Sequence, residues 1–459
     1  MSEFSQFITR ANLKASDDAH RLKLAKAIAT YESAVSATKA SQLIDWQATR
    51  ELAATIKKFT LAHLADLLEQ FEAAFTTRGG KIFWAATATE ASDYIVRVAQ
   101  QHHAKKIVKS KSMTTEEIHL NEQLEAAGIE VRESDLGELI VQLAGEKPYH
   151  IVTPAMHKTK AEISRLFQEK LQAPPTENAE ELTMIARLHL RQDYVTADLG
   201  ITGANFLIAD CGAVGMTENE GNGWLTMACP PVHIVVAGIE KIIPRLGDLS
   251  LFLPMLATSG TGQEITCYNS IVWGPRNSAE NDGPEEMHVI LLDNGRSQLY
   301  ARSELRQALR CIRCGACLNS CPVFRVIGGH AYHTTYQGPI GSVITPHLSG
   351  MTTYQHLAYA SSLCGACSDV CPVHIDLHHL LLVNRAEAIR VTRQPLLWRL
   401  GMRLFAWTMT ARWRLQLMRR LFRLGQPFLF ILKKSRRKRI PKLAAKTFAQ
   451  RWREHEQQP

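Results

Sequence analysis

The chain contains no uninterrupted apolar segment as long as the ~18 residues that a membrane-spanning helix needs. Its opening residues, MSEFSQFITRANLK, include no apolar stretch like that of a secretory signal, so we expect none. A GxGxxG loop or a P-loop in its usual strand-to-helix context is also missing, so the sequence gives nucleotide binding no support. These absences favour a cytoplasmic protein that takes its chemistry from other residues.

Acidic residues are almost absent from residues 391–459, where 18 Lys and Arg stand against Glu454 and Glu456. This segment has a net charge of +16, and since the whole chain has +9, residues 1–390 have −7. Four of the eight tryptophans lie here, Trp398, Trp407, Trp413 and Trp452. Arginines are interleaved with them, namely Arg399, Arg403, Arg412, Arg414, Arg419, Arg420 and Arg423. A basic run follows, Lys433-Lys434-Ser435-Arg436-Arg437-Lys438-Arg439. A basic amphipathic helix is typical of an element that docks on a protein partner or on an anionic membrane surface, here the inner face of the membrane. A solvated helical extension and nucleic-acid binding are the alternatives.

Cysteine is infrequent, at ten in 459 residues, yet seven of the ten lie between positions 311 and 371. They form two runs, Cys311-x2-Cys314-x2-Cys317-x3-Cys321-Pro322 and Cys364-x2-Cys367-x3-Cys371-Pro372. The first run has the ferredoxin spacing, in which a short loop wraps three corners of a cubane cluster and the next cysteine ligates a second cluster. Structural zinc takes four ligands in two pairs, and disulfides belong to an oxidising compartment, so both explain the runs less well. We therefore predict two iron–sulfur clusters, both of the 4Fe-4S type.

Two-cluster ferredoxins indicate how the thiolates divide. Cluster 1 receives Cys311, Cys314, Cys317 and Cys371, and cluster 2 receives Cys321, Cys364 and Cys367. Cluster 2 is then one thiolate short, because a complete repeat has a cysteine at position 361, where this sequence has Ser361. A hydroxyl is a poorer iron ligand than a thiolate. Cluster 2 is accordingly a 3Fe-4S cluster, a labile 4Fe-4S cluster, or one completed by another residue or a partner.

An insert separates the two cysteine runs and contains His330, His333, Tyr336 and His347. It is a candidate cover that keeps solvent from a cluster, and its histidines are a second candidate source of the missing ligand.

The order of patterns predicts an α/β protein in four parts: a helical N-terminal arm at 1–78, an α/β domain at 79–296, a double-cluster domain at 297–390 and a basic helical C-terminal domain at 391–459. From Trp46 to Phe75, apolar residues recur every three or four positions, which predicts an amphipathic helix that ends before Gly79-Gly80. This arm would pack on, or dock against, the next domain.

Short β-rich runs alternate with helical patterns in the α/β domain, which predicts a parallel sheet covered on both faces. The expected strands are Lys81–Trp84, Lys106–Lys109, Ile129–Arg132, His150–Thr153, His233–Ala237, Ile265–Val272 and Met287–Leu292. A helical pattern at Thr114–Ala126 lies between two of them.

Four segments of this domain are rich in glycine and polar residues: 198–205, 210–212, 218–223 and 259–263. Glycines let a backbone present N–H groups to an anion, and the paired acids Glu218 and Glu220 are candidates for acid/base or nucleophilic work. The two interpretations are ordinary loops at strand ends and a ligand crevice at the carboxyl ends of the strands.

Other chemically capable residues of the domain have structural interpretations. We expect His233 to be a core histidine and Arg276 a surface arginine. The scattered Cys211, Cys229 and Cys267 are expected to be small buried residues.

The order of these parts resembles the LutB-type lactate-utilisation iron–sulfur proteins, which join a LUD (lactate-utilisation) domain, a double-cluster domain and a basic C-terminal domain. The resemblance covers nearly the whole chain. It rests on both cysteine runs and on Ala197-Asp198-Leu199-Gly200-Ile201-Thr202-Gly203-Ala204-Asn205, Glu218-Asn219-Glu220-Gly221-Asn222, Pro230-Pro231-Val232-His233-Ile234 and Gly238-Ile239-Glu240-Lys241.

The resemblance implies a LUD domain similar to the sugar-isomerase and CoA-transferase superfamily. It implies that a second cluster with three thiolates is a family trait, Ser361 included. It further implies work beside a cysteine-rich subunit and a second LUD protein, which together oxidise L-lactate to pyruvate while this subunit moves electrons.

We therefore expect an electron-transfer component of a lactate-oxidising complex rather than an enzyme acting alone, and we assign no catalytic residue. Two other functions are compatible with the residues. One is a standalone acyl-transfer or isomerase-type enzyme that uses Glu218 or Glu220. The other is a nucleic-acid-binding iron–sulfur protein, which the basic C-terminal segment favours.

Overall fold

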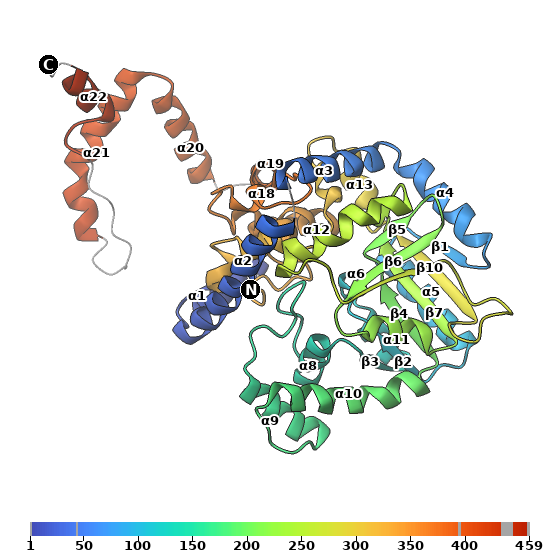
Figure 1. The fold of residues 1–459 in the computed structure, drawn as a ribbon. Coiled ribbons are helices and arrows are strands. Elements are labelled where there is room, and N and C mark those ends of the chain that lie inside the picture. The colour runs from blue at the N-terminus through green and yellow to red at the C-terminus, as the bar shows by residue number, and fades with distance from the viewer. Residues whose placement is uncertain (1, 43–44, 393–395, 433–443, 457–459) are drawn as a thin grey trace. The chain divides into compact units, whose positions relative to one another are not determined.

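The computed structural model describes residues 2–42, 45–392, 396–432 and 444–456, and the chain divides into two compact units, residues 1–391 and 392–459 (Figure 1). The basic run at 433–439 lies outside the described residues. Among the described residues, none of the helices combines the length and the apolar character that crossing a bilayer requires. The predicted division into four regions stays a prediction.

A six-stranded sheet, with every pairing parallel, forms the centre of the first unit. In spatial order its strands are β1 (Lys81–Ala85), β10 (Glu286–Leu292), β7 (Val232–Gly238), β4 (Leu199–Gly203), β2 (Lys106–Lys109) and β3 (Glu130–Glu133). Every residue of β7 is buried, as expected for a strand with both faces covered. Ile234 and Val236 pack on one face, while Val235 and Ala237 pack on the other.

Helices cover both faces of this sheet (Figure 1). The helices of the α/β region are α5 (Ala88–Gln101), α6 (Met113–Glu117), α7 (Leu120–Ala126), α8 (Leu136–Ala144), α9 (Lys160–Leu171), α10 (Ala179–Thr196), α11 (Asn222–Ala228) and α12 (Leu249–Thr261), with short 3-10 turns η1 (Ile239–Lys241) and η2 (Leu246–Asp248). Ile95 of α5 and Leu124 of α7 belong to the core on one face, and Phe71 of α4 (Leu64–Thr76) belongs to the core on the other. The predicted parallel sheet between helical layers is confirmed.

A second, four-stranded sheet lies beside the first and was not predicted. Its order is β8 (Ile242–Ile243), β5 (Phe206–Ile208), β6 (Ala213–Glu218) and β9 (Tyr268–Val272). The sequence pattern hid β4 and β6 because their glycines resemble loop residues. Gly200 is in the middle of β4 because a Cβ there would clash with the carbonyl oxygen of Thr226 in α11.

Two of the predicted strands differ from the structure. Residues 150–153 form no strand, because their backbone groups bond locally. Tyr149 N–H donates to the Pro154 carbonyl, and His150 Nδ1 accepts hydrogen bonds from the N–H groups of Val152 and Thr153. The run predicted at Ile265–Val272 becomes a strand only from Tyr268, and it is a partly exposed strand of the second sheet.

Two predicted helices are each interrupted. The Trp46–Phe75 pattern forms α3 (Trp46–Ala62) and α4, which meet at the non-helical residue His63. The Thr114–Ala126 pattern forms α6 and α7, which are separated at His119, where φ is +52°. Apolar periodicity survives such breaks, so the sequence did not show them.

The N-terminal helices pack against the cysteine-rich region. They are α1 (Glu3–Ala15), α2 (Asp18–Gln42) and α3, while α4 packs on the sheet. Arg50 of α3 donates through Nε to the carbonyl of Cys371 (3.0 Å) and through Nη2 to that of Ser368 (3.3 Å). Lys57, which lies two helical turns after Arg50, donates to the carbonyls of Glu240 (2.8 Å) and Ile242 (3.2 Å). The arm therefore bonds both to a cysteine loop and to the segment that follows β7, η1 and the start of β8 (Ile242–Ile243).

The cysteine-rich region is built from short helices. They are α13 (Arg296–Ala301), η3 (Arg306–Arg310), α14 (Ala316–Asn319), α15 (Phe324–Ile327), α16 (Gly338–Leu348), α17 (Met351–Tyr354), η4 (Gln355–Tyr359), α18 (Ala366–Asp369) and α19 (Leu377–Val391). The second unit contains α20 (Leu396–Met409), α21 (Arg412–Leu432) and α22 (Phe448–Glu456).

Candidate iron–sulfur centres and the adjoining crevice

The two cysteine runs fold into the same loop. In each, a non-glycine residue with positive φ precedes a cysteine: Arg313 (62°) in the first run and Leu363 (56°) in the second. A glycine with positive φ follows that cysteine, Gly315 (81°) or Gly365 (86°), and then a single helical turn begins. Such left-handed residues turn successive N–H groups toward a common centre, which makes a concave site for an anionic group.

Backbone N–H groups already point at two of the sulfurs. Arg313 N–H donates to Cys311 Sγ (3.4 Å), and Ile375 N–H donates to Cys371 Sγ (3.3 Å). Hydrogen bonds to cysteine sulfur are one of the means by which a protein sets the potential of an iron–sulfur cluster.

Two cavities gather the seven cysteines into two sets. The first is lined by Cys311, Cys314, Cys317 and Cys371, and the second by Cys321, Cys364 and Cys367. The first has an apolar wall that includes Ile340 and Ile375, whereas the second is also lined by Ser361, Ser362 and His378. Four sulfurs in a dry, apolar cavity fit a cubane cluster, and the second cavity offers three sulfurs and a few polar groups.

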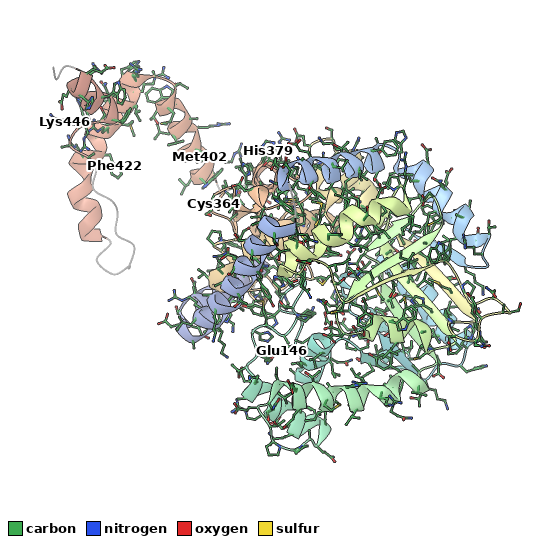
Figure 2. The ribbon with its side chains drawn as sticks, viewed as in Figure 1. Glu146, Cys364, His379, Met402, Phe422 and Lys446 are labelled. Atoms are coloured by element: carbon green, nitrogen blue, oxygen red, sulfur yellow. The ribbon has the colours of Figure 1, made fainter. Side chains whose placement is uncertain are left out.

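The thiols differ in burial, and the exposed one, Cys364, belongs to the second set. Burial raises the pKa of Cys371 to about 11 and that of Cys367 to about 12, and it raises the pKa of Cys314 and Cys317 as well. A bound metal overcomes this cost, because a coordinating thiol is deprotonated outright. Cys364, by contrast, is exposed at the surface (Figure 2), and the Ala366 N–H holds its pKa below the usual value.

Ser361 occupies the place that Cys311 has in the first loop. Leu363 N–H donates to Ser361 Oγ (3.1 Å), just as Arg313 N–H donates to Cys311 Sγ. The hydroxyl lies in the wall of the second cavity. The two loops therefore have the same backbone hydrogen bond at the aligned positions, which supports the alignment of Ser361 with a missing cysteine.

The insert covers the cavities with α16 rather than with its histidines. Ile340 lines the first cavity and Pro339 the second. None of the three candidate histidines, His330, His333 and His347, lines either cavity. His330 bonds to the Lys147 carbonyl, and His347 bonds to Asn384.

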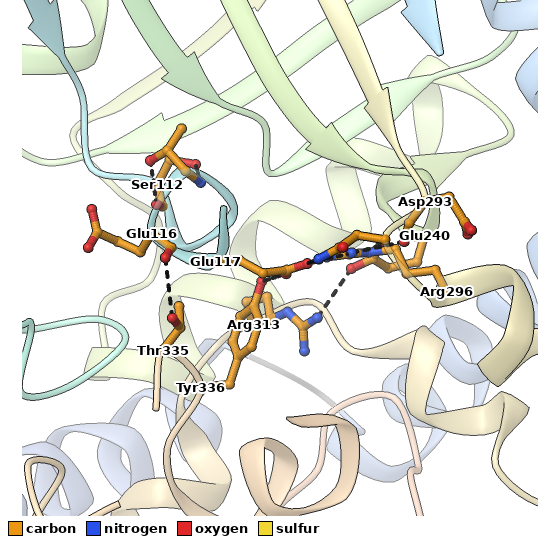
Figure 3. A network of polar contacts seen from close by, with 11 residues as sticks. Ser112, Glu116, Glu117, Glu240, Asp293, Arg296, Arg313, Thr335 and Tyr336 are labelled. Atoms are coloured by element: carbon orange, nitrogen blue, oxygen red, sulfur yellow. Dashed lines mark hydrogen bonds and ion pairs between the residues drawn. The ribbon is translucent and has the colours of Figure 1, made fainter. Parts of the chain in front are cut away.

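A buried ion network joins the first cysteine loop to the sheet (Figure 3). Arg296 bonds to Glu240 (Nε to Oε2, 2.6 Å) and to Glu117 (Nη2 to Oε2, 2.8 Å). Arg313 bonds to the other oxygen of Glu240 (3.2 Å) and lies over the ring of Tyr336, whose hydroxyl donates to Glu117 (2.7 Å). Burial raises the pKa of Glu240, but Arg296 and Arg313 outweigh it and hold the value at about 2.

Sequence reasoning missed this network. Its members come from five segments between positions 117 and 336, and no local pattern pairs them. Glu240 was noticed only as part of a family motif.

A crevice lies where the glycine-rich segments come together. It is lined by residues 203–205, by Glu218, Glu220 and Asn222, and by Gly260, Thr261 and Gln263. The segment at 210–212 lies elsewhere: Asp210 accepts a hydrogen bond from Leu246 N–H, and Gly212 contacts α4. Three of the four segments thus form a crevice rather than unrelated loops.

The two acids in this crevice differ in role. Glu218 accepts hydrogen bonds from Gly223 N–H (2.6 Å) and Trp224 N–H (2.7 Å), so both its oxygens cap the start of α11. Glu220 accepts one from Leu136 N–H (3.0 Å), and burial raises its pKa to about 7.

The remaining candidates have structural roles. His233 is fully buried, and its Nε2 lies 2.9 Å from Thr202 Oγ1, as expected of a core histidine. Arg276 is a surface arginine that pairs with Glu285 (2.5 Å). The prediction that the scattered cysteines are buried is wrong for Cys229 and Cys267, which are exposed because they lie in loops at the ends of α11 and β9.

Comparison with known proteins gives consistent matches. The LUD domain family matches residues 68–292, and the 4Fe-4S dicluster domain family matches residues 307–375. Lactate utilization protein B of Anoxybacillus flavithermus is 47% identical over 368 residues, which cover 80% of this chain and 78% of that protein. Lactate utilization protein B of Bacillus subtilis is also 47% identical over 368 residues, with 80% and 77% covered. A crystal structure of a DUF162 family protein from Deinococcus radiodurans aligns with 50% of this chain and 98% of its own at 14% identity and a TM-score of 0.27, too low to support an argument.

A LUD domain followed by a 4Fe-4S dicluster domain defines an iron–sulfur protein with two 4Fe-4S clusters. The chain belongs to the lactate utilization protein B family. It is accordingly a lactate-utilisation iron–sulfur protein, and both the predicted family and the predicted cofactors are confirmed.

The geometry at Ser361 predicts that cluster 2 is the more fragile centre. In air, it should convert to a three-iron form before cluster 1 changes, because its fourth position lacks a thiolate and Cys364 is exposed. Ser361→Cys should slow that conversion several-fold, as followed by EPR and iron content. Ser349→Cys, which adds a thiol at an exposed position outside both cavities, is the control and should behave as the parent. Equal oxidation rates for the two clusters of the parent protein would contradict the prediction.

Proposed function

We propose that this chain is the electron-transfer subunit of a multi-protein system that oxidises L-lactate to pyruvate. The supporting observation is that the seven cysteines lie in one compact unit and extend from its interior to its surface. Cys314 lies in the wall of the crevice beside the parallel sheet, and Cys364 is exposed at the surface. This arrangement suits the passage of electrons between a buried site and a partner protein.

The proposal assigns the thiolates as the two cavities group them. Cluster 1 is held by Cys311, Cys314, Cys317 and Cys371, and cluster 2 by Cys321, Cys364 and Cys367. When bound, the clusters supply one-electron chemistry. The chain's own residues fix the sulfur positions, donate N–H groups to them, and exclude water from the first cavity through Ile340 and Ile375.

Lactate oxidation also requires a group that accepts two electrons, and no flavin or nicotinamide fingerprint is legible in this sequence. We assign that group to companion subunits, a cysteine-rich protein and a second LUD protein, as the family resemblance implies. The name of the relatives, lactate utilization protein B, supports the substrate.

The geometry weakens the alternative of a standalone acyl-transfer or isomerase-type enzyme. Glu218 is committed to capping α11 with both oxygens, which leaves Glu220 as the acid available in the crevice. We retain a kinship of the LUD domain with the sugar-isomerase and CoA-transferase superfamily as part of the proposal, with catalysis of that type lost.

The second unit is proposed as a docking element for a partner or for an anionic membrane surface. Large apolar side chains of α20 are exposed, among them Leu397, Phe405 and Trp407, while Arg414 of α21 lies 4.5 Å from the ring centroid of Trp407. Exposed apolar groups interleaved with arginine are typical of interaction surfaces. Binding to nucleic acid is the alternative for the same charge.

The isolated chain should not oxidise lactate. Cluster-loaded protein mixed anaerobically with L-lactate and an artificial acceptor should turn over only when the companion subunits are present. Cys314→Ala should abolish that turnover by removing a thiolate of cluster 1, while circular dichroism shows the LUD domain still folded. Cys229→Ala, which removes an exposed cysteine outside both cavities, is the control. Robust pyruvate formation by the isolated chain would overturn the proposal.

Truncation after Arg390 should leave both clusters intact, since every proposed ligand precedes that residue. It should weaken attachment to the companions or to anionic vesicles, because it removes a charge of +16 and the exposed apolar residues. Iron analysis and co-purification at raised salt are the measurements. A truncated protein that binds its companions and vesicles as before would show that the segment has no docking role. Loss of a steeply salt-dependent binding to nucleic acid would favour the alternative.

A further inference from the structure

The crevice lies at the carboxyl edge of the parallel sheet. Four residues that line the crevice each lie two or three positions after the end of a strand of this sheet. They are Lys111 after β2, Asp135 after β3, Asn205 after β4 and Lys241 after β7. In open parallel sheets, ligands bind outside this edge, where loops from several strands converge. The crevice therefore stands where a ligand site is expected from the topology.

The opposite wall of the crevice belongs to the first cysteine loop. Arg313 and Cys314 of this loop line it, together with Tyr336 of the insert between the cysteine runs. Arg313 and Cys314 also line the cavity of the cluster 1 cysteines, as does Ile151. A ligand in the crevice is consequently separated from cluster 1 only by this shared wall.

Two cations that line the crevice have donor groups without a hydrogen-bond partner within the described residues. Arg313 uses Nη2 for Glu240, but its Nη1 is buried and bonds to nothing. The ammonium of Lys241, a residue that is 9% exposed, makes no hydrogen bond or ion pair. Buried polar groups are normally satisfied, so the free Nη1 of Arg313 needs an explanation. The ammonium of Lys241 is not fully buried, and this residue lines the same crevice.

Neighbouring buried cations are satisfied by the protein itself. Lys57 donates to two backbone carbonyls, and Arg296 pairs with Glu117 and Glu240. Lys109 pairs with Glu116 and Glu133. Among the described residues, lone buried arginine nitrogens without a hydrogen-bond partner also occur at Arg132 and Arg310, but in the crevice such a donor, on Arg313, lines the same space as an unpaired ammonium, that of Lys241.

The charges nearby favour a small monoanion as the missing partner. Three buried cations, Arg296, Lys57 and Lys241, and the nearly buried Arg313 face the carboxylates of Glu117 and Glu240. The thiolates of cluster 1 add negative charge on the side of Cys311, so the surplus of positive charge has room for a small anion only. An Arg guanidinium and a Lys ammonium on one wall match a carboxylate. Asp135, Glu218 and Glu220 also line the crevice, and their carboxyl groups disfavour a bulky dianion such as a phosphate ester. Hydroxyl and amide groups of Ser112, Asn205 and Thr261 line the same space.

We propose that the crevice binds a small 2-hydroxy or 2-oxo monocarboxylate against the wall of cluster 1, with its carboxylate held by Lys241 and Arg313. This inference rests on the proposed function, because the lactate system supplies the ligand class. It places a substrate or product site in this chain, beside the first centre of the electron path.

The test is a calorimetric titration of the anaerobic, cluster-loaded full chain with pyruvate and with L-lactate, paired with EPR of the reduced protein. Saturable binding is expected, with a change in the signal of cluster 1 and none in that of cluster 2. Propionate, which lacks the 2-oxygen, should bind more weakly, and inorganic phosphate should not displace pyruvate. No binding by the parent protein, or displacement by phosphate at equal concentration, would overturn the inference.

Variants at Lys241 locate the site. Lys241→Met should weaken pyruvate binding about tenfold or more, as expected for the loss of a charge-assisted hydrogen bond, and Lys241→Arg should restore most of it. Lys170→Met, at an exposed position on α9, is the matched control. If Lys241→Met shifts the potential of cluster 1 and leaves pyruvate affinity unchanged, the cation serves the cluster and the inference fails. Lactate oxidation with the companions is measured separately, so a chain that supports turnover but binds no pyruvate refutes this site and leaves the electron-transfer role standing.

Discussion

The arrangement of the site depends on the ion pairs that the Glu240 carboxylate makes with Arg296 and Arg313. Glu240 lies two residues beyond β7 and bonds through one oxygen to Arg296 (2.6 Å) and through the other to Arg313 (3.2 Å). Arg313 immediately precedes Cys314, so this buried carboxylate ties the first cysteine loop to the carboxyl edge of the sheet (Figure 3). Breaking a buried ion pair by removing one partner typically costs about 3–5 kcal/mol, which explains why the loop and the sheet form one unit.

The same contact leaves the two cysteine sets in different surroundings. The cavity of the first set is lined by apolar residues and by Arg313. Arg50 of α3 donates a hydrogen bond to the Cys371 carbonyl and so fixes the position of this cysteine. The second set reaches the surface at Cys364 and has Ser361 where the first has Cys311. The first set of cysteines thus lies against the LUD domain, and the second set reaches the surface. This asymmetry is what the electron-transfer proposal uses.

Local patterns predicted what is local in this protein. Cysteine spacing identified two clusters, and buried β-rich runs predicted most of the parallel sheet, with β2 matched at both ends. The interruptions at His63 and His119 escaped because apolar periodicity continues across them. Glycine in β4 resembled a loop, although Gly200 is there for close packing against α11. Glu117, Glu240 and Arg296 could not be paired from the sequence, since their contacts span 56 to 179 residues.

Potentiometric EPR on Glu240→Gln tests most directly whether this carboxylate sets the surroundings of cluster 1. The substitution keeps the shape of the side chain and removes one buried negative charge beside the first cysteine loop. Loss of a negative charge stabilises the reduced, more negative form of a cluster, so the potential of cluster 1 should rise while that of cluster 2 stays unchanged. Unchanged potentials for both clusters, or equal shifts in both, would contradict the account.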